Sequence, residues 1–194
     1  PGHPFTVRWQ AQVNELDAKL VVASYSNTIL SAHVGVWHID ALFQFNVAQG
    51  KMKECMIHLP VDVHVTRVQG QHIRDWDVHT QDDFQVLRVE LNQEQTTRYD
   101  LHVIAEQGIA SMPATGQLPK LFAIDTMHNQ GHLLIGSNSA IHISNQKNTG
   151  LKQIDTGAFP RAQERSVRPM PRHILYAFEC ASDEIGRASG RERV

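Results

Sequence analysis

Histidine is the side chain in this sequence that most readily suggests a chemical site, because the chain contains twelve. Strands bring metal ligands together at spacing i, i+2 and helices at i, i+4. No two histidines are two positions apart, and the pair at i, i+4, His128 and His132, is separated by Asn-Gln-Gly, which is typical of a turn. We therefore interpret the histidines as solvent-facing strand residues and predict no metal site. They are His3, His33, His38, His58, His64, His72, His79, His102, His128, His132, His142 and His173.

Acidic pairs offer a second possible chemistry. Asp75 and Asp77 flank Trp76 and would share one face of a strand, which is compatible with the paired carboxylates of a glycosidase. A charged, solvent-facing strand edge beside a buried Trp explains them as well, and we favour that interpretation. Asp82-Asp83 lacks the Asp-x-Asp-x-Asp-Gly pattern of a calcium loop. Because the chain also lacks a Gly-x-Ser-x-Gly elbow and a Gly-rich phosphate loop, we predict no catalytic residue, no cofactor and no enzymatic activity.

Three tryptophans could form a sugar-stacking platform if they were exposed. Trp9 and Trp76 are adjacent to or in phase with apolar residues, which predicts that both pack in the core. Trp37 falls out of phase with Val36, and we take it as the candidate ligand-binding residue.

Composition excludes several classes of protein. The 194 residues are 41% hydrophobic and 20% charged, as in a folded globular chain. A net charge of -2 without a basic stripe argues against a nucleic-acid surface. The chain has no apolar run of about 18 residues, so we predict no membrane-spanning helix. Cys55 and Cys180 are interpreted as free or buried thiols, although the sequence leaves their pairing open.

The elements that must position these residues are strands. Apolar and polar residues alternate with period two throughout residues 56–106, and short polar breaks divide this stretch into extended runs. Similar runs precede it and follow it, at 7–13, 19–25, 28–39, 42–47, 54–59, 121–126, 132–136, 140–144, 151–154 and 172–180. The pattern predicts an all-β protein with an antiparallel β-sandwich at 1–107, a Gly- and Pro-rich linker at 107–119, and a smaller β-rich unit at 118–183.

The last eleven residues, Glu184–Val194, do not follow this pattern. Their sequence, EIGRASGRERV, has no period and resembles the translation of a short-read sequencing adapter. An ordinary disordered C-terminus is the alternative. Together with Pro1 at the start of the chain, this tail leads us to expect a fragment of a longer, metagenomic protein.

Several short motifs carry a family resemblance. They are Leu59-Pro60, Val68-Gln69-Gly70, Ile73-Arg74-Asp75-Trp76, Tyr99-Asp100-Leu101 and the Gly-x-Leu-x-Ile-Gly pattern at 131–136. With these motifs the chain resembles a β-sandwich module of large, uncharacterised envelope-associated proteins of planctomycete-type bacteria. The resemblance implies a periplasmic, envelope or secreted location and brings no catalytic residue. A more distant resemblance is to the β-sandwich N-terminal domain of zinc aminopeptidases, whose His-Glu-x-x-His motif is absent here.

We therefore expect a non-catalytic structural or interaction module of a larger secreted or envelope-associated bacterial protein. Its partners would be neighbouring domains of the parent protein or other proteins. A carbohydrate- or ligand-binding β-sandwich is one alternative, and an accessory domain of an enzyme whose active site lies outside this fragment is another. Clustered exposed aromatic rings on a sheet face would favour binding of a ligand, and an apolar patch along an edge would favour an interaction module or an accessory domain.

Overall fold

A computed structural model describes residues 19–109, 117–138, 141, 143–144, 150–160 and 168–180. The strand expected at 7–13, Trp9 and the tail Glu184–Val194 lie outside these ranges. The described part is built from strands with one short 3-10 turn, which confirms the all-β prediction. It has no helix with the length and apolarity needed to cross a membrane. The elements are β1 (Val21–His33), β2 (Val36–Gln49), β3 (Met52–Pro60), β4 (Val63–Gly70), β5 (Ile73–Gln81), β6 (Phe84–Gln95), β7 (Arg98–Gly108), β8 (Phe122–Ala123), β9 (His128–Ser137), β10 (Leu151–Ile154), η1 (Thr156–Ala158) and β11 (His173–Cys180).

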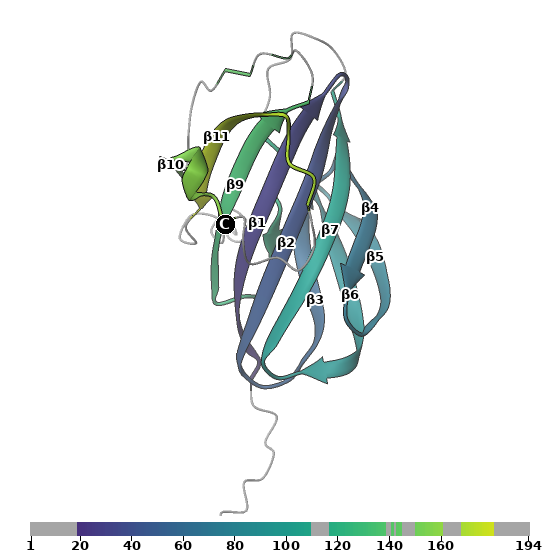
Figure 1. Ribbon diagram of the computed structural model, residues 1–194. Coiled ribbons are helices and arrows are strands. Elements are labelled where there is room, and N and C mark those ends of the chain that lie inside the picture. Colours follow the sequence, from purple (N-terminus) through teal and green to yellow (C-terminus); the bar gives the residue numbers. More distant parts are fainter. Residues whose placement is uncertain are drawn as a thin grey trace, which may run out of the picture.

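The strands form two sheets that pack as the layers of a sandwich (Figure 1). One sheet has seven strands in the order β10-β11-β9-β1-β2-β7-β4, and the other has four in the order β5-β6-β3-β8. The period-two alternation places one set of side chains from each strand between the layers. Fully buried residues of this core include Ile39, Phe43, Phe45, Leu101, Ile57, Leu59 and Leu87.

The first hairpin differs from the prediction, which divided this region into strands at 19–25 and 28–39 with a break at Ser26-Asn27. β1 runs through both residues without interruption, and the turn comes later, at Val34-Gly35. Gly35 has a φ of +81°, a left-handed conformation that costs glycine little. Asn27 is buried between β2 and β9, and its backbone carbonyl accepts a hydrogen bond from Arg168, a contact that local sequence does not reveal.

Strand pairing joins the two expected units. β8 pairs with β3 in the smaller sheet, while β9, β11 and β10 continue the larger sheet beyond β1. The described strands of 118–183 therefore complete the two sheets begun by residues before 107. The described strands before residue 107 pair with one another in antiparallel fashion, as predicted, whereas β9 pairs with β1 in parallel. A parallel pair needs a long connection, and the chain between β1 and β9 includes β2 to β8.

Candidate functional site

The most buried polar group on the outer face of the larger sheet is formed by Asp40, His102 and Arg168. The Arg168 Nε donates a hydrogen bond to Asp40 Oδ1 at 2.5 Å, and its Nη2 donates to the carbonyl oxygens of Asn27, at 2.9 Å, and of Asp40. His102 Nε2 lies 2.9 Å from the same Asp40 oxygen. The side chains of Arg168 and Asp40 are only 4% and 11% exposed. This group connects β1, β2 and β7, so its geometry is that of a structural anchor.

The electrostatics of Asp40 agree with a structural role. Burial by itself would raise the pKa of this carboxyl, but the hydrogen bond from His102 and the positive charge of Arg168 outweigh it. The pKa of Asp40 is therefore held below its ordinary value. A carboxylate that is ionised, closed off from solvent and fully engaged has little capacity to act as a general base.

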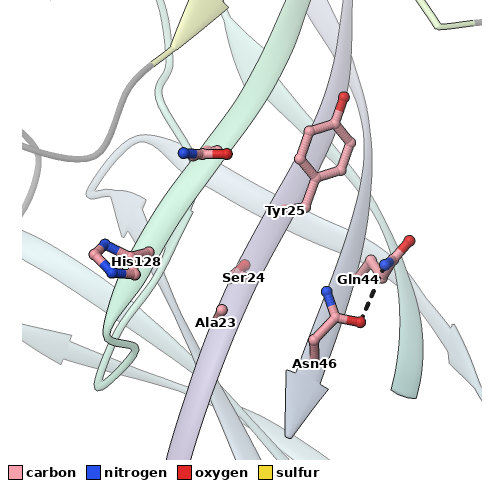
Figure 2. Close-up of a pocket in the computed structure, with 7 residues that line it drawn as sticks. Ala23, Ser24, Tyr25, Gln44, Asn46 and His128 are labelled. Carbon is pink, nitrogen blue, oxygen red and sulfur yellow. Dashed lines mark hydrogen bonds between the residues drawn. The ribbon is translucent and has the colours of Figure 1, made fainter. Parts of the chain in front are cut away.

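A groove of about 430 Å³ lies on the same outer face, towards one end of the sheet (Figure 2). We call it the outer-face groove. Its lining combines apolar surface with the amide side chains of Gln44, Asn46 and Gln130, and Gln44 Nε2 donates to Asn46 Oδ1 at 3.1 Å within it. Its volume is within the usual range for small-ligand sites, and amides with an aromatic ring suit a neutral polar ligand. The lining residues are Ala23, Ser24, Tyr25, Gln44, Asn46, His128 and Gln130.

Tyr25 is the aromatic residue of this groove, and its hydroxyl is already engaged. The Tyr25 Oη lies 2.5 Å from His132 Nδ1, and the two rings meet edge to face with centroids 5.7 Å apart. Burial, reinforced by the negative charge of Glu179, raises the pKa of Tyr25, while burial lowers the pKa of His132. Because both groups stay neutral near pH 7, Tyr25 offers the groove a neutral aromatic ring.

The described histidines are distributed over both sheets, and only some of them face solvent as predicted: His64, His72, His79, His128 and His173 are exposed, whereas His33, His38, His58, His102 and His132 are partly buried. His3 and His142 lie outside the described ranges. The largest histidine cluster found is His33 with His38, whose rings lie 4.4 Å apart edge to face. His38 Nδ1 lies 3.0 Å from Glu106, and His33 Nε2 lies 2.9 Å from Asn138 Nδ2. Within the ranges that the structure describes, no group of three or more His, Cys, Asp or Glu side chains could hold a metal ion.

His58 is the described histidine whose surroundings are most aromatic. It lies on β3, with its ring stacked on Phe122 at 4.3 Å and on Phe84 at 4.9 Å between centroids. Burial lowers the pKa of His58 in the folded chain. The unfolded chain therefore binds a proton more readily than the folded chain once the pH falls below about 6.5. At neutral pH this difference does not change the free energy of unfolding. As the pH falls from the unfolded-state pKa of His58 through its lower folded-state pKa, the free energy of unfolding decreases.

We expect the free energy of unfolding to fall between about pH 7.5 and about pH 5, and to fall less in a His58→Phe variant. Phenylalanine keeps the aromatic stack but cannot bind a proton. Urea titrations of both proteins at each pH would measure the difference. Equal pH dependence in the two proteins would contradict this role of His58; the lowered pKa values of His33 and His132 would account for any loss that remains.

Trp76 is not a core residue, which corrects the prediction. It occupies the face of β5 that looks toward the core, opposite Val89 of β6, yet it is 37% exposed. The reason is that β5 is the edge strand of its sheet, so no further strand of the described part of the chain covers the ring. Trp37 shows the opposite result: it is half-buried and packs against the core in phase with Ile39. Its proposed ligand-binding role stays a prediction, and it does not line the outer-face groove.

The acidic pair beside Trp76 lies on the other face of β5, as predicted. Asp75 Oδ1 accepts a hydrogen bond from the Trp76 backbone N–H at 2.8 Å, and the Asp77 carboxylate contacts His79 Nε2. Neither carboxylate lines the outer-face groove. We call the free side of β5, residues 75–81 on the side away from β6, the β5 edge. Figure 1 shows β5 beside β4 along the right-hand side of the molecule.

The two cysteines are free thiols, as the sequence interpretation favoured. Burial raises the pKa of Cys55 to about 12, with a smaller contribution from Glu54, and burial also raises the pKa of Cys180. Both are therefore protonated at neutral pH, and a protonated thiol is a poor nucleophile.

Sequence reasoning missed the outer-face groove and the Arg168 anchor. Both depend on pairings between distant segments: His128 lies opposite Ala23 because β9 pairs in parallel with β1, and Arg168 is 128 positions from Asp40. The one available signal was the set of polar residues at alternate positions on β2, which includes His38, Asp40, Gln44 and Asn46. That signal indicates a polar face but not which residues meet on it.

No family model matches this chain, and no curated protein matches it. Solved structures do match. Native leukotriene A4 hydrolase from Saccharomyces cerevisiae is 13% identical, with a TM-score of 0.45, and the match covers 87% of this chain and 28% of that one. The M1 zinc metallopeptidase from Deinococcus radiodurans is 8% identical, with a TM-score of 0.43, over 84% of this chain and 38% of that one. This chain thus spans well under half the length of the solved proteins it is similar to.

Proposed function

We propose that this β-sandwich is a non-catalytic interaction module of a larger protein. The observation that carries the proposal is the β5 edge, where the large Trp76 side chain is exposed on a strand without a neighbour on one side. An exposed tryptophan favours an interface, since tryptophan is enriched among the residues that contribute most to the binding energy of protein interfaces. Ile73 and Val78 on the same strand are partly buried and pack on the core, so the edge has an apolar base.

The polar side chains of the molecule support the same proposal. The buried carboxylate, Asp40, is engaged by Arg168 and His102, and the thiols of Cys55 and Cys180 are held protonated. These groups stabilise the fold in the positions where they lie.

The proposal is tested by selecting displayed peptides of about twelve residues on the native chain and then comparing variants. A Trp76→Thr variant keeps a residue suited to strands and should cost only about 1–2 kcal/mol of stability, because the ring is partly exposed at an edge. Selected peptides should bind the native chain at least about tenfold more tightly than this variant. Met127→Thr, which removes another exposed apolar side chain (64%), is the matched control and should leave binding unchanged.

A second candidate function is binding of a neutral carbohydrate in the outer-face groove, favoured by the ring of Tyr25 beside amide side chains. The same chain is therefore titrated with soluble oligosaccharides by calorimetry. Selection that yields no Trp76-dependent peptide, together with saturable oligosaccharide binding that Tyr25→Ala abolishes, would replace the interaction module with a carbohydrate-binding module.

A further inference from the structure

Four strands form the edges of the two sheets, and they differ in how open they are. β8 and β10 are only two and four residues long, and the eight-residue β4 carries a bulge between Val65 and Arg67. Short strands and bulges are devices that prevent an edge from pairing with another chain. β5 has nine residues, and its irregularity lies near its start, between Ile73 and Asp75. The β5 edge is therefore the longest regular edge in the described part of the chain.

The backbone of the β5 edge has a known direction. The N–H of Trp76 donates to the side chain of Asp75 at 2.8 Å, so it points away from β6. In an antiparallel strand, alternate residues direct their backbone groups to the same side. Val78 and Thr80 therefore direct their backbone groups outward as Trp76 does. An extended segment placed beside β5 could therefore form hydrogen bonds with these outward donors and acceptors, because they repeat at the spacing of a strand.

The two faces of the β5 edge carry different side chains. Trp76 and Val78 lie opposite Val89 and Leu87 of β6, on the apolar face, whereas Asp75 and Asp77 lie on the outer face. An added strand alternates its side chains in the same way. Each residue of a partner that lies beside Trp76 or Val78 would meet apolar surface, and its neighbours would meet a carboxylate.

Charge around this edge is predominantly negative. Residues 73–83 contain four carboxylates, those of Asp75, Asp77, Asp82 and Asp83, against the single Arg74. Arg74 lies 3.9 Å from Glu90, so its charge is already balanced in part. Arg88, which is opposite Asp77 in the register, is bound by Glu54 at 2.8 Å and by Glu90 at 2.9 Å. A partner that complements this edge carries positive charge.

From these observations we infer that the β5 edge binds an extended segment in which Lys or Arg alternates with apolar residues, by adding it as a further strand of the smaller sheet. The inference rests on the proposed interaction function and names the chemistry of its partner. In the free chain the Asp75 carboxylate accepts the hydrogen bond of the outward Trp76 N–H, so this donor is not available for pairing with another strand. When the segment binds, one of its backbone carbonyls accepts the hydrogen bond from the Trp76 N–H in place of Asp75. The Asp75 carboxylate then pairs with a basic side chain of the segment. Main-chain hydrogen bonds would supply affinity and the alternation would supply specificity.

The test uses fluorescently labelled synthetic peptides of about ten residues and measures their affinity by fluorescence anisotropy. The probe alternates Lys or Arg with Val or Ile. One control has the same composition in a non-alternating order, a second has Glu in place of the basic residues, and a third is N-methylated at alternate residues to remove the donors on one side. We expect each control to bind at least about tenfold more weakly than the probe.

Variants of the chain locate the binding site. Thr80→Pro removes one outward N–H but leaves the hydrogen bonds to β6 intact, and proline at such a position is tolerated in edge strands. It should lower the affinity for the probe peptide about tenfold. The double variant Asp75→Asn and Asp77→Asn should lower the affinity for the probe peptide several-fold and make that affinity less dependent on salt concentration. The matched control, Asp100→Asn with Asp125→Asn, removes the same charge at other exposed positions and should have no effect. Circular dichroism melts establish that each variant is folded.

The outcomes separate this inference from the proposed function. Equal affinity for the alternating and non-alternating peptides would overturn the inference. Selected peptides that depend on Trp76 but are insensitive to N-methylation and to Thr80→Pro would overturn strand addition and leave the interaction function standing. Failure of both the designed probe and the displayed library to bind the edge would overturn both.

Discussion

Replacing Asp40 with Ala is expected to lower the free energy of unfolding by about 3–5 kcal/mol. The substitution leaves the Arg168 guanidinium, whose side chain is 4% exposed, buried without its carboxylate. An uncompensated buried charge is one of the most costly defects in a protein interior. His102 would lose the same partner. Urea unfolding at pH 7, followed by circular dichroism, measures the effect.

Asp100→Ala provides the matched control on the same sheet face. Asp100 accepts from Arg98 Nε at 2.8 Å, but both side chains are about half exposed, and exposed pairs contribute less than about 1 kcal/mol. A loss of similar size in the two variants would show that the contacts of Arg168 do not anchor the sheet. Asp40→Asn should fall between them, because the amide oxygen can still accept hydrogen bonds but carries no charge.

The pH dependence of the same site has a defined sign. Since the folded-state pKa of Asp40 lies below its value of about 3.9 in an unfolded chain, the folded state holds the ionised form more strongly. This stabilisation is fully present above about pH 4 and is lost as the pH falls through the folded-state pKa. The stability difference between the native chain and Asp40→Asn should therefore shrink in acid. A constant difference down to about pH 2 would contradict this electrostatic account.

Replacing Gly131 with Ala is expected to destabilise the fold by about 3 kcal/mol, the second large effect. Gly131 lies opposite Ser26 where β9 pairs with β1, and an added Cβ would collide with the Ser26 carbonyl oxygen. A backbone atom in the middle of a sheet cannot move aside as the end of a flexible side chain can. Thermal or urea unfolding would measure the loss.

Gly108 is the matched glycine, because a Cβ at that position would meet no atom within 4 Å in the described structure. Gly108→Ala should leave stability unchanged or raise it by up to about 1 kcal/mol, since alanine restricts the unfolded chain. Equal losses at Gly131 and Gly108 would show that the effect is not the close approach of β9 to β1. At Gly136, at the other end of the same motif, an added Cβ would likewise collide with the Pro171 ring and with the His173 carbonyl oxygen.

The sequence correctly predicted those strands whose pattern depends only on neighbouring residues. Alternation of apolar and polar residues at period two depends only on the residues of one strand, so β6, β7 and β11 were recognisable in the chain. The break predicted at Ser26-Asn27 failed because residues typical of turns can be retained within a strand by a distant partner, in this case Arg168 bonded to Asn27.

The sequence by itself determined the strands, the alternation of their faces and therefore the β-sandwich class. Only the tertiary structure decided which strands lie at edges, and with that whether an in-phase residue such as Trp76 is covered. It also decided that β9 joins β1 in parallel and that Arg168 reaches Asp40. The physical reason is that phase is a property of one strand, whereas burial and charge pairing depend on which distant segment packs beside it.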